Sequence, residues 1–139
     1  SRGLGDVYKR QLHTMYNIRI KRKNQVIYRK VVFLMEYKFT SDNFQQEVLE
    51  SKEPVMIDFY ADWCGPCQMM GPVVANFAEE YAGKIKIGKV NTDAEPQLAK
   101  DYQVMSIPNF VFIKDGKVVD QAIGAVSADA LKEKLDALL

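Results

Sequence analysis

The stretch Trp63-Cys64-Gly65-Pro66-Cys67 holds both cysteines of the chain. Two residues separate the sulfur atoms, and Gly65-Pro66 is a turn-forming pair that can lead into a helix, so a small disulfide can close between the two cysteines. This pattern predicts a two-electron redox switch. We interpret the rest of the chain as the support for this stretch.

Length and composition favour one domain without a membrane span. The chain has 139 residues, of which 47% are hydrophobic and 27% charged, enough for one substantial core. Charged residues interrupt the apolar runs, so no segment approaches the roughly 20 apolar residues of a membrane-spanning helix. Two cysteines and one histidine fall short of the about four ligands of a zinc site, which argues against a metal site in a monomer.

The charge distribution divides the chain at Met35. Residues 1–34 contain nine Lys and Arg and one acidic residue, a net charge of +8, whereas residues 35–139 contain ten Lys and 17 acidic residues, a net charge of −7. Every arginine lies in the first part. We therefore expect residues 1–34 to be an extension outside the domain, disordered or poorly packed, and residues 35–139 to form the domain.

The extension has three interpretations. Residues 1–11 resemble a translated transposase-type sequencing adapter, so the first interpretation is a library-preparation scar in an assembled gene; residues 12–34 are then translated upstream sequence or a leader that begins at Met15. The second interpretation is a basic arm for nucleic acid or membrane, given the basic run 19–23. The third is a secretory signal, although Arg29-Lys30 interrupts its apolar segment. We rank them in this order and expect neither nucleic acid nor membrane as a partner.

From Met35 onward, strand and helix signals alternate. Strands are predicted over 35–39, 55–60, 84–91, 109–113 and 118–123, and helices after Asn43, after Cys67, from Thr92 to Tyr102 and after Ser127. This order predicts an α/β domain with a mixed five-stranded sheet flanked by four helices.

Polar and turn residues mark the expected element boundaries. Residues 40–43 and Ser127 supply N-cap side chains, residues 92–95 fit a capping box, Gly83 ends the long helix, and Asp115-Gly116 predicts a hairpin.

Asp58 conflicts with its surroundings. The run 55–60 is otherwise apolar and is predicted to be a central strand, buried on both faces. A carboxylate in that place costs several kcal/mol unless it is paired or protonated, and burial raises its pKa. A purely structural role explains this residue poorly.

These residues together resemble the thioredoxin family. The similarity includes the run 58–67, Pro72, Ile107-Pro108 and the run 114–116, in the family's order and spacing, and it covers residues 35–139. It implies the thioredoxin fold and a bacterial-type cytoplasmic protein-disulfide reductase, which takes part in electron transport and cell redox homeostasis. It also implies a thioredoxin reductase and disulfide-containing client proteins as partners, and no bound cofactor besides the redox-active disulfide. Whether the reductase uses NADPH or ferredoxin stays open.

The resemblance assigns catalytic roles to four residues. Cys64 is the exposed nucleophile at the start of the long helix, where unpaired amides favour a thiolate. Cys67 is the guarded resolving thiol. Asp58 is its general base, and Lys89 on the neighbouring strand is the matching lysine, although a solvent-facing lysine in an alternating strand explains Lys89 nearly as well.

The resemblance also predicts a docking patch around Cys64. Pro108 corresponds to the family's cis-proline, which leaves the backbone of Ile107 free to pair with an extended client segment. The expected substrate-binding residues form a flat, mostly apolar surface: Trp63, Gly65, Pro66, Ile107, Pro108, Gly124 and Ala125.

Three departures from the family pattern bear on partner preference. Tyr60 stands where many members have tryptophan, Gln68 follows Cys67 where a basic residue is frequent, and residues 35–139 contain no arginine. Two other functions compete with the reductase: a disulfide oxidant or isomerase of a secretory compartment, and a non-catalytic interaction subunit. Gly65-Pro66 resembles the reducing members, since oxidants and isomerases usually have a histidine next to the second cysteine.

Overall fold

The computed structural model describes residues 35–139, so the interpretations of residues 1–34 lie outside the described residues. The elements follow in the order β1 (Tyr37–Lys38), η1 (Gln45–Leu49), β2 (Val55–Tyr60), α3 (Gly65–Glu80), β3 (Lys86–Asn91), α4 (Pro96–Asp101), β4 (Asn109–Lys114), β5 (Lys117–Ile123) and α5 (Ala128–Asp136). No helix within 35–139 combines the length and the apolar character that crossing a membrane requires.

The five strands form one mixed sheet in the order β1-β3-β2-β4-β5. β3 pairs in parallel with β1 and β2, and β4 pairs antiparallel with β2 and β5. The helical crossover from β2 to β3 is long enough to bring these strands into parallel pairing, whereas the two-residue loop between β4 and β5 can join only antiparallel neighbours. The predicted α/β thioredoxin fold with a mixed five-stranded sheet is confirmed.

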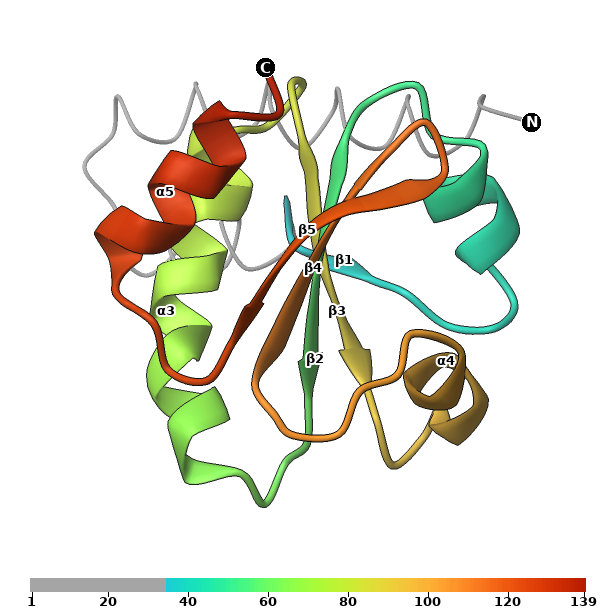
Figure 1. Cartoon of the computed structure of the whole chain (residues 1–139), viewed down its shortest axis with the longest axis vertical. Coiled ribbons are helices and arrows are strands. Elements are labelled where there is room, and N and C mark those ends of the chain that lie inside the picture. Colours follow the sequence, from blue (N-terminus) through green and yellow to red (C-terminus); the bar gives the residue numbers. More distant parts are fainter. Residues whose placement is uncertain (1–34) are drawn as a thin grey trace, which may run out of the picture.

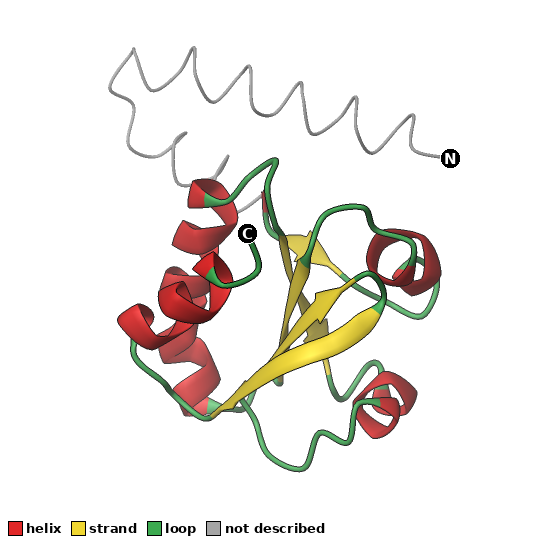
Figure 2. Cartoon of the chain, turned by 45° about the horizontal axis from the view of Figure 1, so that its top comes forward, coloured by secondary structure: helices red, strands yellow, loops and turns green. Residues whose placement is uncertain are grey.

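Helices cover both faces of the sheet (Figures 1 and 2). α3 and α5 pack on one face, where Met70, Val74 and Leu131 share a core with Met56 of β2. η1 and α4 cover the other face, where Val48 and Leu98 belong to a second core cluster. β2 is the middle strand, and its first five residues are buried. The strand therefore contributes to both cores.

Local sequence signals explain two of the boundaries. Asp115 and Gly116 both have positive φ, 53° and 76°, as a two-residue hairpin loop requires. Ser127 accepts a hydrogen bond through its Oγ from the amide of Ala130, at 3.1 Å, and so caps α5. Both predictions are confirmed.

Other predicted caps are wrong. η1 has no side-chain cap, because Asn43 instead closes a turn by accepting from the Thr40 amide and donating to the Lys38 carbonyl. The predicted capping box at residues 92–95 does not form either. Asn91 Oδ1 accepts from two amides of that turn, and α4 begins only at Pro96. In each turn an asparagine side chain, Asn43 or Asn91, hydrogen-bonds to the backbone of the turn, and the predicted helix cap does not form.

The ends of two elements also differ from the prediction. α3 ends at Glu80, and the positive φ of Gly83 serves the turn that follows. The strand predicted over 84–91 begins at Lys86, because the amides of Lys84 and Ile85 still bond to the carbonyl of Tyr81. The helix therefore unwinds through a turn before β3 starts.

Two glycines provide a matched test of this packing. A Cβ on Gly88 would lie 2.6 Å from the carbonyl oxygen of Tyr37 in β1, whereas a Cβ on Gly71 inside α3 would meet nothing within 4 Å. We expect Gly88→Ala to lower the free energy of unfolding by about 1–3 kcal/mol, because β1 must move away. We expect Gly71→Ala to raise it by roughly 0.5–1 kcal/mol. Urea unfolding measures both, and equal effects of the two substitutions would contradict this account of β1.

Candidate redox site

Cys64 is the N-cap residue of α3. The backbone amide of Cys67 donates a hydrogen bond to its Sγ at 3.2 Å, and the amide of Gln68 donates to its carbonyl oxygen at 3.1 Å. Upstream, the amide of Cys64 bonds to the carbonyl of Ala61, which closes the turn between β2 and α3. The sulfur of Cys64 thus lies at the positive end of the helix dipole, where negative charge is stabilised.

Cys64 and Cys67 form a disulfide, with their Cα atoms 5.2 Å apart. The expected contrast between an exposed Cys64 and a guarded Cys67 is wrong as a statement about exposure, because the two residues are 4% and 5% exposed. The contrast lies in the surroundings. Cys64 lines an open surface pocket, and Cys67 is absent from the described residues that line it.

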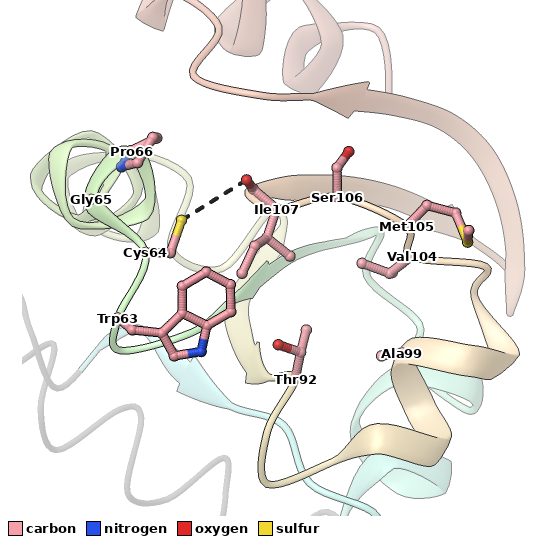
Figure 3. Close-up of a pocket in the computed structure, with 10 residues that line it drawn as sticks. All are labelled: Trp63, Cys64, Gly65, Pro66, Thr92, Ala99, Val104, Met105, Ser106 and Ile107. Atoms are coloured by element: carbon pink, nitrogen blue, oxygen red, sulfur yellow. Dashed lines mark hydrogen bonds between the residues drawn. The ribbon is translucent and has the colours of Figure 1, made fainter.

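The loop before β4 lies against the disulfide. The Ile107–Pro108 bond is cis, as the family resemblance predicts. The Sγ of Cys64 lies 3.9 Å from the carbonyl oxygen of Ile107, the contact drawn as a dashed line in Figure 3. The amide of Gly124, whose φ is +90°, donates to the carbonyl oxygen of Pro108 at 2.8 Å. This bond ties the end of β5 to the same loop.

The pocket beside Cys64 has a volume of about 470 Å³ (Figure 3). Four of the seven residues expected to bind the client line it, namely Trp63, Gly65, Pro66 and Ile107. The other three, Pro108, Gly124 and Ala125, do not line it.

Five further residues of the pocket escaped the sequence prediction. They come from the turn after β3, from α4 and from the loop that follows α4: Thr92, Ala99, Val104, Met105 and Ser106. Met105 is 93% exposed although it is apolar. Its position two residues before Ile107 was the one available signal. The contribution of α4 arises only from tertiary packing.

The indole of Trp63 is fixed by a hydrogen bond. Its Nε1–H donates to Asp93 Oδ2 at 2.9 Å, although the residue is 71% exposed. The ring therefore stands beside Cys64 on the rim of the pocket (Figure 3). An exposed aromatic ring beside an apolar pocket suits a surface that contacts another protein.

Asp58 lies on the face of the sheet that α3 covers. Side chains alternate along a strand, so Asp58 shares its face with Met56, which packs in the core beneath α3. Asp58 pairs in register with Lys89 of β3 on one side and with Phe110 of β4 on the other. It is 4% exposed, and its Oδ1 accepts no hydrogen bond from any described residue.

This environment raises the pKa of Asp58 to about 7. Burial is the main cause, followed by the negative charge of Glu36, whereas the attraction of Lys89 acts in the opposite direction. A carboxyl group that titrates near neutral pH can exchange a proton with a thiol, as a general base requires.

Lys89 is more enclosed than a solvent-facing lysine. Its side chain is 27% exposed, and its Nζ lies 3.8 Å from Glu36 Oε1 and 5.2 Å from the ring centroid of Tyr60. The solvent-facing interpretation is therefore wrong. Glu36 was absent from the predicted site, and its single signal in the sequence was its place as an acidic residue in the predicted first strand, 35–39.

Within residues 35–139, no cluster of three or more His, Cys, Asp or Glu side chains is arranged to hold a metal ion.

Comparisons with known proteins agree with this geometry. A thioredoxin family model matches residues 36–137. "Thioredoxin 1" of Nostoc sp. is 50% identical over 97 residues, which cover 70% of this chain and 91% of the relative. "Thioredoxin" of Chlorobaculum thiosulfatiphilum is 46% identical over 100 residues, 72% of this chain and 93% of the relative. "Thioredoxin M-type, chloroplastic" of Pisum sativum is 39% identical over 127 residues, 91% of this chain and 74% of the relative.

The raised pKa of Asp58 makes stability depend on pH. Between the ordinary value of 3.8 and about 7, the folded protein keeps a proton that the unfolded chain has lost, so stability falls as pH rises through this range. We expect Asp58→Asn, which removes this effect, to raise the free energy of unfolding by roughly 4 kcal/mol at pH 8. Below pH 4 the variant and the parent should be alike.

Urea unfolding of the oxidised full chain at pH 3.5 and pH 8 measures this difference. A difference that stays the same at both pH values would show that Asp58 is ordinarily ionised in the folded protein.

Proposed function

The chain belongs to the thioredoxin family and is a thiol–disulfide oxidoreductase with general protein-disulfide reductase function, and from this premise we propose the roles of its individual residues. Cys64 is the nucleophile, Cys67 is the resolving thiol, and Asp58 is the proton acceptor. The observation that carries the proposal is the hydrogen bond from the Cys67 amide to the Sγ of Cys64 at the N-terminus of α3.

In the first step, the Cys64 thiolate attacks one sulfur of a client disulfide. The Cys64–client bond forms as the client S–S bond breaks, and the other client sulfur leaves as a thiolate that takes up a proton. The amide of Cys67 and the helix dipole stabilise the attacking thiolate. The position of Cys64 in the pocket lets a client sulfur approach it.

In the second step, Cys67 releases the reduced client. Asp58 accepts the thiol proton of Cys67, directly or through water, and the resulting thiolate attacks the Sγ of Cys64. The mixed disulfide breaks, the second client sulfur leaves as a thiolate, and the Cys64–Cys67 disulfide forms. Two electrons have then passed from the protein to the client. The pKa of about 7 for Asp58 supports this role, because the carboxyl group can accept a proton at neutral pH.

The client binds as an extended segment across the pocket. Trp63, Met105 and Ile107 offer the apolar contacts, and the backbone of the Ile107–Pro108 loop offers hydrogen bonds beside the sulfur. Gly124 and Ala125 belong to the surrounding surface in this proposal, and the hydrogen bond from the Gly124 amide to the Pro108 carbonyl supports their placement next to the loop. Pro108 is buried, so its part is to hold the backbone of Ile107 in place. Lys89, on β3, acts on Asp58 through its positive charge, which lowers the pKa of that carboxyl group.

The disulfide is restored to the dithiol by a thioredoxin reductase, and the protein works as a monomer in the cytoplasm, where it donates electrons to client enzymes and supports redox homeostasis. Bacterial relatives and the Gly65-Pro66 pair favour this setting over an oxidant of a secretory compartment. The relative from Pisum sativum is named as chloroplastic, so the chloroplast is the competing compartment. Fractionation of the natural host decides between the two.

A matched pair of cysteine substitutions tests the order of attack. We expect Cys67→Ser to accumulate a mixed disulfide between Cys64 and an insulin chain when the reduced variant meets disulfide-bonded insulin, because the first step proceeds and the second cannot. Cys64→Ser should form none. Non-reducing electrophoresis with mass spectrometry of the cross-linked peptide measures this, with turnover by the unchanged full chain and a thioredoxin reductase as the reference. A mixed disulfide through Cys67 in the Cys64→Ser variant would reverse the roles.

A second matched pair tests the docking surface. Met105 lines the pocket and is 93% exposed, whereas Met69 of α3 is 73% exposed but lies outside the pocket. We expect Met105→Ser to raise the KM for insulin about 3- to 10-fold, because a loss of about 1 kcal/mol of apolar contact changes binding by this factor. We expect Met69→Ser to leave the KM unchanged. Equal effects on both KM values would locate client docking elsewhere.

A further inference from the structure

Glu36 forms part of the environment of Asp58, although the chain places it before β1, more than 20 residues from the cysteine loop. Its side chain is 3% exposed, and its Oε1 lies 3.8 Å from Lys89 Nζ. Burying a carboxylate away from water is costly unless a cation or a proton accompanies it. The burial of Glu36 beside a lysine of the redox site therefore requires an explanation.

The strand register explains how Glu36 reaches this place. Tyr37 pairs with Gly88, and Lys38 pairs with Lys89, so β1 lies alongside β3. Tyr37 packs against the core under η1 and α4, so its strand neighbour Lys38 points toward the α3 face. Glu36, just before the strand, lies on the same side, because its Oε1 is 3.8 Å from Lys89 Nζ. Lys89 and Asp58 lie on this same face. Glu36 just before β1, Lys89 of β3 and Asp58 of β2 thus form a cluster of three ionisable groups.

We propose that Glu36 is a positioning residue of the redox site: it holds the Lys89 ammonium group and places a second negative charge beside the proton acceptor Asp58. Glu36 touches neither the client nor a sulfur, and it acts through its charge. This inference rests on the proposed role of Asp58 as the base for Cys67. It adds a residue that sets the pH at which that base becomes available.

The electrostatics have a definite sign. Glu36 raises the pKa of Asp58, and Lys89 lowers it by a smaller amount. Burial likewise raises the pKa of Glu36, against the attraction of Lys89. One ammonium group therefore serves two buried carboxyl groups and cannot fully neutralise both, so the second carboxyl group keeps its proton until the solution is near neutral.

The other groups around Asp58 do not replace Glu36. On β4 its register partner is Phe110, which carries no charge. On its own strand, Tyr60 is half-buried and its pKa is raised, by burial first, so it stays neutral at pH 7. On α3 the cysteine pair is oxidised in this structure. Glu36 and Lys89 are the charged groups to which the pKa of Asp58 responds.

The test is the titration of Asp58 in the oxidised full chain, followed by the carboxyl ¹³C shift and assigned with Asp58→Asn. We expect Glu36→Gln to lower the titration midpoint of Asp58 from about 7 by roughly half a pH unit or more. The acid limb of the pH profile for insulin reduction should move the same way. Glu36→Ala also removes the charge and is expected to give the same result. It serves as the second variant if the buried amide of Glu36→Gln disturbs folding.

Glu47→Gln is the matched control. Glu47 also pairs with a lysine of β3, with 3.0 Å between its Oε2 and Lys86 Nζ, but Lys86 lies at the opposite end of that strand from the site. Removing the charge of Glu47 should leave the titration midpoint of Asp58 unchanged. An unchanged or raised midpoint in both Glu36 variants, or an equal fall in Glu47→Gln, would overturn the proposal. Failure of the unchanged chain to reduce insulin would refute the proposed function. The titration needs no client, so it would still decide whether Glu36 sets the pKa of Asp58.

Discussion

The burial of β2 on both of its faces is the constraint on which the redox site depends. Val55 to Phe59 pack between the two core clusters, so the strand has almost no freedom to move. The same strand carries Asp58 and leads directly into the turn at Ala61 that delivers Cys64 to the start of α3. One buried strand therefore positions both the carboxyl group and the sulfur pair. A looser strand would let the distance between the Asp58 carboxyl group and the cysteine pair vary.

The same burial raises the pKa of Asp58 and makes its ionised form costly. A carboxyl group on a solvated strand would be ionised at all neutral pH values and would bind a proton poorly. Enclosed under α3, with Glu36 nearby, it titrates at about 7 and destabilises the folded protein whenever it ionises. Stability is thus lower than an uncharged residue would allow. The protein retains a group whose protonation changes in the range where thiols exchange protons.

Sequence patterns predicted the elements better than their ends. The apolar run of β2 and the hairpin at Asp115-Gly116 depend on residues next to one another, and both are present as predicted. The helix starts near Asn43 and Asn91 differ, because the side chain of each asparagine bonds to backbone groups of a turn that precedes the helix. A sequence shows which groups can cap, but not which of several competing bonds forms.

The sequence by itself determined the chemistry of the site. Two cysteines separated by Gly65-Pro66 and an acidic residue in an apolar strand are local facts, and they predict a dithiol switch and a carboxyl group with a raised pKa. The role of that carboxyl group as a base was implied by the family resemblance alone. Only the tertiary structure decided which residues surround that switch. Met105 and Ala99 enter the pocket because α4 packs against the sheet, and Glu36 meets Lys89 because β1 pairs with β3. Burial and charge act through space, so pocket shape and the pKa of Asp58 depend on neighbours that are distant along the chain.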